Sequence, residues 1–212
     1  MSISVDTYAL VSVEEAKNYL LESPVTNLDT KEDLIIRLIN GLSSTAETYM
    51  NRKILARDYT EDYDGTGTDT IQLKQYPINS ITSVCVDEDR QFPSSKEIQL
   101  DDIIIYSEEG KIRRSPSGLY VYIDDETGKI IKYSVFNRGK KNVRIIYNAG
   151  YSTVPYDIKH AVLEELVMHY ENITKKKVGV TGISAAGEHV SVFLGDLLPT
   201  TKMILSSYRK LI

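Results

Sequence analysis

Hydrophobic residues recur with a helical period at both ends of the chain. Ser12 and Glu15 form a capping box ahead of a short apolar run that stops at Pro24, which predicts a short first helix. A longer apolar stripe, with a period of about 3.6 residues, follows Thr30, a candidate N-cap, and predicts a second helix with one buried face. The residues expected on the buried face are Leu34, Ile35, Leu38, Ile39, Leu42, Ala46, Tyr49 and Met50. Those expected on the exposed face are Lys31, Glu32, Arg37, Asn40, Ser44 and Glu47.

The pattern changes from about residue 57 to residue 151. Short alternating runs are separated by turn signals, as expected for antiparallel strands. Residues 54–63 and 71–73 flank the segment DGTGTD, and this arrangement predicts two paired strands joined by a hairpin turn. Further strands are expected at 81–86, 103–106, 119–123, 130–135 and 143–147. Strands of this length and spacing favour a sandwich or a small barrel, and the pattern does not decide between them.

Helical spacing returns after Pro155. An apolar stripe from Ile158 to Tyr170 predicts a third helix, which ends near three consecutive lysines at 175–177. The glycine-containing segment 178–196 is interpreted as a mobile loop or a weak hairpin. Pro199 can occupy the first turn of a last helix. The basic residues at the end of this helix interact favourably with the helix dipole.

These patterns predict an α+β protein. The helices at the two ends are expected to pack into one small bundle, with an antiparallel β module inserted between them. The expected parts are 1–56 and 155–212 for the helical body, with the mobile loop at 178–196, and 57–154 for the β module.

Composition narrows the class of protein. With 212 residues, of which 42% are hydrophobic, the chain can form a substantial core. Its net charge of −5 argues against a general nucleic-acid binder, which needs clustered basic residues. Cys85 is the single cysteine, so an intramolecular disulfide is excluded and a reducing compartment is the simpler expectation. No apolar run approaches the roughly 18 residues that a bilayer requires, and a soluble, unsecreted protein without membrane contact is expected.

The sequence carries no catalytic motif, and we expect no enzyme, cofactor or metal site. His160, His169 and His189 lack the spacing of a metal site. Acidic clusters could supply the paired carboxylates of a glycosidase or bind a divalent ion, although acids at turns are usually solvated. The lysines at 175–177 could bind phosphate or an acidic protein, but a basic helix end is the commoner explanation. The acidic clusters are Asp87-Glu88-Asp89, Asp101-Asp102, Glu108-Glu109 and Asp124-Asp125-Glu126.

The order of several short motifs resembles the head-to-tail connector, or adaptor, proteins of tailed bacteriophages and prophages. The motifs are VSVEEAKNYL, AETYMNRKIL, YPINSITSV, YNAGY, VPYDIKHA and the ending from Leu198 to Arg209. The resemblance spans nearly the whole chain. Each motif is short and degenerate, and their order carries the likeness.

The resemblance implies a structural role in the virion, at the junction of head and tail, after assembly in the host cytoplasm. Copies of the chain would form a ring, commonly twelve-fold, beneath the portal protein. The ring would prolong the DNA channel and provide the docking surface for a stopper or tail completion protein. An acidic chain suits such a channel, because DNA must pass without being held.

The C-terminal residues are the expected contact with the portal. The resemblance implies that Tyr208, Arg209, Lys210, Leu211 and Ile212 dock there, with the two basic residues meeting acidic portal groups. The alternative is that the last helix merely packs on the second one. Two other functions stay open: a ligand- or carbohydrate-binding module that uses the β insert, and a hydrolase that uses Asp124 or Asp125.

Overall fold

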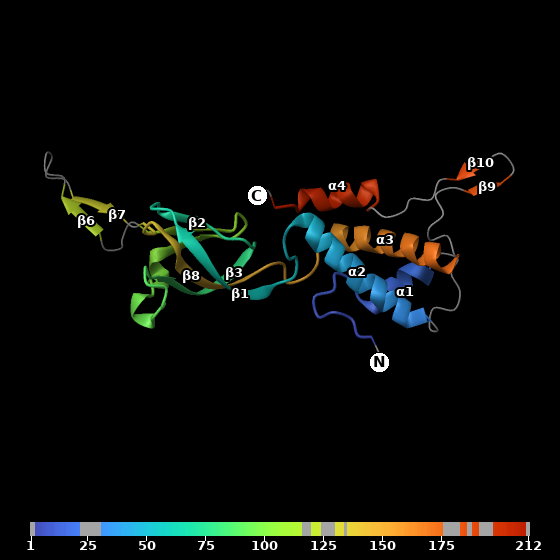
Figure 1. The fold of residues 1–212 in the computed structure, drawn as a ribbon, viewed down its shortest axis with the longest axis horizontal. Helices are drawn as coiled ribbons and strands as arrows, with labels where there is room; N and C mark the ends of the chain where they lie inside the picture. Colours follow the sequence, from blue (N-terminus) through green and yellow to red (C-terminus); the bar gives the residue numbers. More distant parts are fainter. Residues whose placement is uncertain are drawn as a thin grey trace. The chain divides into compact units, whose positions relative to one another are not determined.

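The computed structural model describes residues 3–21, 31–115, 135–175 and 197–210, together with the backbone of 120–123, 130–133, 183–185 and 188–190. The chain divides into two compact units. One consists of Met1–Ile54 and Thr153–Ile212, which we call the helical unit, and the other of Leu55–Ser152, which we call the β unit. Figure 1 shows helices from both ends of the sequence in the helical unit. The predicted α+β class, with terminal helices and an inserted antiparallel module, is therefore confirmed.

The helical unit contains α1 (Val13–Leu21), α2 (Glu32–Met50), α3 (Tyr156–Thr174) and α4 (Pro199–Ser207), with a small hairpin of β9 (Ile183–Ala185) and β10 (Glu188–Val190). The predicted capping box is confirmed, since the Ser12 amide donates to Glu15 Oε2 at 2.8 Å and the Glu15 amide donates to Ser12 Oγ at 3.1 Å. Thr30, the expected cap of α2, lies outside the described residues. At its other end α2 stops at Asn51, whose left-handed backbone (φ 53°) reverses the chain.

The helices pack on one another as the amphipathic stripes require. Each of α1, α3 and α4 contacts α2, and α3 also contacts α1 and α4. Polar pairs join the helices at the surface: Lys159 to Glu15 at 2.6 Å and Lys17 to Glu32 at 2.7 Å. The buried apolar residues of the helices are Ala16, Leu20, Ile35, Ile36, Ile39, Leu42, Ala46, Met50, Ile158, Ala161, Val162, Leu166, Tyr170 and Leu205.

One prediction for α2 is wrong. The helical pattern predicts Glu47 on the exposed face, yet this residue is only 7% exposed. The reversal at Asn51 places the following residues over that side of the helix, where Lys53 Nζ lies 2.7 Å from Glu47 Oε2 and the Ile54 amide lies 3.3 Å from Oε1. The carboxylate is thus buried with partners rather than solvated.

The β unit contains two antiparallel three-stranded sheets. One has the order β1-β8-β3, formed by Arg57–Gly65, Gly139–Ala149 and Ile78–Val86. The other has the order β2-β5-β4, formed by Thr70–Gln72, Lys111–Arg114 and Ile103–Tyr106. Residues of both sheets share one hydrophobic core, and no closed barrel is formed by the described strands. The core residues are Ile71, Leu73, Ile78, Ile81, Val84, Ile103, Ile112, Phe136, Val143, Ile145, Tyr147 and Ala149.

Four further elements complete the described part of the β unit. The short 3-10 helices η2 (Ser94–Lys96) and η3 (Leu100–Asp102) connect β3 to β4. The strands β6 (Tyr120–Ile123) and β7 (Ile130–Tyr133) form a separate two-stranded hairpin.

The predicted hairpin between the first two strands is wrong, because β1 pairs with β8 and β2 pairs with β5. The end of β1 is held by the first residues of β8. The Lys141 amide donates to Asp64 Oδ1 at 2.7 Å, and Asn142 Oδ1 accepts from the Gly65 amide at 2.8 Å. Non-local contacts therefore decide how these strands pair.

Candidate interaction site of the helical unit

The predicted contact segment is fastened to its own helical unit. The Tyr208 hydroxyl donates to the Asp157 carboxylate, whose oxygens lie 2.9 and 2.8 Å away, and the Lys210 amide donates to the Met50 carbonyl at 2.9 Å. The Arg209 guanidinium lies 5.8 Å from the centre of the Tyr49 ring, within reach of a cation–π interaction. Leu211 and Ile212 lie outside the described residues. The described end of the chain thus packs on α2 and α3.

A buried acid holds the start of α4. Glu165 on α3 is 1% exposed, and its Oε1 accepts a hydrogen bond from the Leu198 amide. The Thr201 hydroxyl donates to the Ala161 carbonyl at 3.5 Å, so α4 runs antiparallel along α3. A carboxylate next to the first turn of a helix also suits the helix dipole. The sequence offered one signal for this contact, since Glu165 interrupts the apolar stripe of α3.

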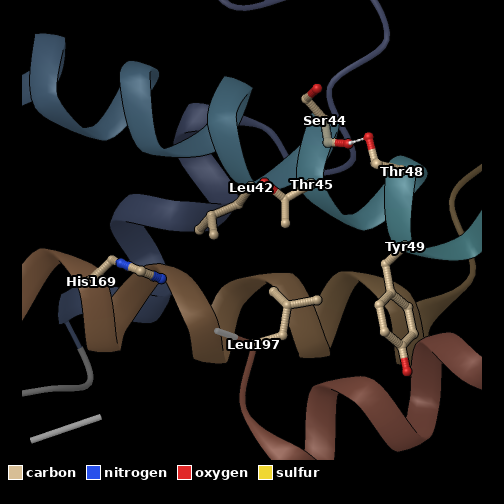
Figure 2. A pocket seen from close by; sticks show the side chains of 7 residues that line it. All are labelled: Leu42, Ser44, Thr45, Thr48, Tyr49, His169 and Leu197. Carbon is tan, nitrogen blue, oxygen red and sulfur yellow. Dashed lines mark hydrogen bonds between the residues drawn. The ribbon is translucent and has the colours of Figure 1, made fainter. Parts of the chain in front are cut away.

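A groove of about 470 Å³ borders this contact. Figure 2 shows its lining by side chains of α2 and by His169 and Leu197. The hydroxyls of Thr45 and Thr48 donate to the carbonyls of Gly41 and Ser44, one turn earlier, at 2.9 and 2.8 Å. His169 Nε2 lies 3.7 Å from the buried Glu165 Oε2. The groove therefore offers a partly apolar surface whose threonine hydroxyls are already bonded within α2. Its lining residues are Leu42, Ser44, Thr45, Thr48, Tyr49, His169 and Leu197.

His160 is not among the residues that line this groove. His160 stands on α3, with Nδ1 at 3.4 Å from the Tyr19 hydroxyl and Nε2 at 3.6 Å from Glu164. His189 belongs to β10. Within the described residues no group of three or more His, Cys, Asp or Glu side chains could hold a metal ion.

In the cluster Asp87-Glu88-Asp89, Glu88 and Asp89 are exposed as expected for acids at turns, but Asp87 is not. Asp87 is 1% exposed and accepts hydrogen bonds from the amides of Gln91 and Phe92, at 2.7 and 2.9 Å, and from Lys96 Nζ. The ion pair with Lys96, together with these amides, holds the pKa of the Asp87 carboxyl well below its usual range. This acid serves the fold of the loop after β3.

Only some of the remaining charged candidates lie among the described residues. Lys175 pairs with Glu171 on the preceding turn at 2.7 Å, and Lys176 and Lys177 lie outside the described residues. Asp124, Asp125 and Glu126, the candidate acids of a hydrolase, also lie outside them.

The β unit has a second groove, of about 430 Å³, which bears on the alternative of a ligand-binding module. Its charged lining residues are of both signs: Lys96, Glu97, Asp102 and Arg114. Lys96 is already paired with Asp87, and Arg114 donates to the Val135 carbonyl at 2.9 Å.

No helix in the described part of the chain is both long and apolar enough to cross a membrane.

Solved structures with a similar fold come from particles of the gene transfer agent (GTA). A chain in a structure described as the virion of the native GTA particle has a TM-score of 0.59 at 12% identity, with 100% of this chain and 95% of that one covered. A chain in the neck of the empty GTA particle, computed with C6 symmetry, has a TM-score of 0.54 at 14% identity, with 100% and 95% covered. A chain in the neck of the native particle, computed with C12 symmetry, has a TM-score of 0.50 at 13% identity, with 99% and 97% covered. At such identities the likeness establishes the fold.

The sequence itself identifies the family. No curated protein sequence matches the chain significantly. The head completion protein family, however, matches residues 9–118 and 104–211, which together include both ends of the helical unit and the β unit between them. The chain therefore belongs to the head completion protein family.

Proposed function

We propose that the chain is a structural subunit of the head-to-tail junction of a phage or phage-like particle. Copies would form a ring under the portal protein, prolong the DNA channel and present the docking surface for a stopper or tail completion protein. The observation that carries this proposal is the family match along residues 9–211. The fold shared with chains from GTA neck structures, one of them computed with C12 symmetry, supports the location and a ring.

The charge of the chain is compatible with a channel. Each phosphate that a protein neutralises adds to its affinity for DNA and would slow the passage of the duplex. The net charge of −5 works against such retention. DNA would thus pass through the ring without specific binding.

The C-terminal segment is the proposed portal contact. Tyr208 binds Asp157 and the Lys210 amide binds Met50, so the segment is presented on α2 and α3 rather than as a separate tail. The Arg209 residue is exposed and the Lys210 residue partly so. Both can therefore meet acidic groups on a portal while their backbone stays fixed.

Binding to portal-bearing heads tests the proposal. The native chain should bind such heads and form rings that are visible by electron microscopy. The double variant Arg209→Glu/Lys210→Glu should lose binding while its melting temperature falls only slightly, because exposed charges and an exposed cation–π contact contribute little to stability. Lys202→Glu, on the preceding helix α4, is the matched control and should bind like the native chain. Failure of the native chain to bind would refute the function, and normal binding by the double variant would refute only the contact.

A further inference from the structure

The strand β4 leaves part of its backbone without a partner. It is one of the two outer strands of the β2-β5-β4 sheet, with Ile104 opposite Arg113 and Ile105 opposite Ile112. In an antiparallel ladder, pairs of opposed residues that hydrogen-bond to each other alternate with pairs that do not. Asp102 and Ser115 form a bonded pair, because the Ser115 amide donates to the Asp102 carbonyl at 2.7 Å. The backbone groups of residues 102, 104 and 106 therefore bond to β5. The N–H and C=O groups of Ile103 and Ile105 therefore point to the outer edge. The Ile103 amide donates to the Leu100 carbonyl, whereas within the described part of the chain Ile105 forms no backbone bond on that side.

This edge is also apolar and exposed. Ile104 and Ile105 are 41% and 44% exposed, although both are large hydrophobic residues. The outer strand β1 of the other sheet differs, because it carries Asp58, Glu61 and Asp62. Charges on an outer strand block pairing with another chain, whereas an uncharged apolar edge favours it. Of these two edges, β4 is the one suited to accept a further strand.

The ends of β4 restrict which strand can be added. Asp101 and Asp102 precede it, and Glu108 and Glu109 follow it closely. Two β4 strands in antiparallel pairing would bring these acids together, and like charges in opposed positions are destabilising. A suitable partner is therefore an apolar strand with basic residues beside it.

The strand β7 of the same sequence meets this description. Within the described residues β6 and β7 pair only with each other, and an isolated two-stranded hairpin is at best marginally stable. The sequence around β7 is KIIKY, two isoleucines between Lys129 and Lys132, and β7 has four residues like β4. The sequence after β6 is acidic, so β6 would be repelled by the ends of β4. The other hairpin, β9 and β10, has shorter strands and contains Glu188 in place of lysine.

We propose that β7 of one copy of the chain adds to the edge strand β4 of a neighbouring copy. This inference rests on the ring proposed above. The contact uses different surfaces on the two copies, so its repetition by a rotation that closes generates a ring, whereas a symmetric contact would stop at a dimer. Backbone hydrogen bonds would hold the pair, and the charges at its ends would set its direction and its partner.

Cross-linking between separately labelled copies tests the pairing. The variants Ile105→Cys and Ile131→Cys are made separately in the otherwise native chain. Ile130→Cys is made as a third variant, because a shift of one residue in the pairing register moves the side chains of β7 to the other face of the sheet. The native chain is the background control, since its single cysteine, Cys85, is buried and its burial raises the pKa of the thiol. The variants are assembled on portal-bearing heads, singly and mixed, and oxidised before non-reducing electrophoresis.

A disulfide-linked dimer should form only in assembled mixtures that contain Ile105→Cys with one of the β7 variants. Tyr156→Cys is the matched control: Tyr156 is 89% exposed but lies on α3, and its variant should give no dimer with the β7 variants. Rings that show no such cross-link, or a dimer of Ile105→Cys with itself, would overturn the pairing and leave the proposed function intact. If the native chain forms no rings on heads, both fall together.

Discussion

At the scale of single residues, buried acids hold segments of backbone that adjoin helices or strands. Glu47 lies close to the Ile54 amide, Asp87 accepts from the Gln91 and Phe92 amides, and Glu165 accepts from the Leu198 amide. The sequence predicted solvated positions for the first two, because an acid on a polar helix face or in a turn is usually exposed. Their partners depend on how the chain turns back, which no local pattern encodes.

The low pKa of Asp87 predicts a dependence of stability on pH. The unfolded chain takes up the proton of this carboxyl at a higher pH than the folded chain does. Its contribution to stability is therefore complete above about pH 4, the ordinary pKa of an aspartate, and is lost as the pH falls further. Urea unfolding at pH 7 and pH 3 should show a smaller loss of stability for Asp87→Asn than for the native chain. The exposed Asp101 supplies the control, and Asp101→Asn should retain the native loss. Equal losses in all three proteins would contradict the prediction.

At the scale of elements, the sequence predicted the helices better than the pairing of the strands. A stripe of apolar residues is a property of the helix itself, and the capping box of α1 needs only Ser12 and Glu15. Strand pairing depends on distant segments, so the expected partnership of β1 and β2 was wrong. The strand β5 was missed because Lys111–Arg114 contains one apolar residue, Ile112, which is fully buried between two neighbouring strands.

The candidate contact segment shows the same limit. Its residues were predicted from the resemblance to a family. The bond between Tyr208 and Asp157, 51 positions apart in sequence, required the antiparallel packing of α4 on α3. The sequence could identify this segment as a candidate contact. It could not show that the segment is hydrogen-bonded to α2 and α3 of its own chain.

The anchoring of α4 by Glu165 can be tested directly. Glu165→Ala removes the acceptor of the Leu198 amide and should lower the free energy of unfolding by about 1–3 kcal/mol, because a buried donor is left unpaired. Hydrogen exchange should become faster in α4 relative to α2. Glu164→Ala, at the next, more exposed position of α3, is the control and should leave exchange in α4 unchanged. Native exchange rates in α4 of Glu165→Ala would show that the anchor is dispensable.

At the scale of the whole molecule, the β unit begins and ends at neighbouring points. Leu55 and Tyr151 form a parallel bridge, and the Ala56 amide donates to the Tyr151 carbonyl at 2.9 Å. A short connection could therefore replace the entire segment Leu55–Ser152. We expect a chain with a short glycine-serine linker in its place to fold into the helical unit.

Circular dichroism and thermal unfolding of the linked chain measure this outcome. A helical spectrum with a cooperative transition is expected, since the two units have separate internal contacts. The matched control carries the additional substitution Leu166→Asp at a fully buried position of α3 and should lose the transition. Absence of a cooperative transition in the linked chain itself would show that the helical unit needs the β unit in order to fold.

The adjacent ends of the insert also have an evolutionary consequence. Recombination can replace a segment whose two ends meet without altering the spacing of the residues that flank it. The sequence of the β unit can thus change independently of the helical unit, because the residues that pack the helices lie outside the exchanged segment.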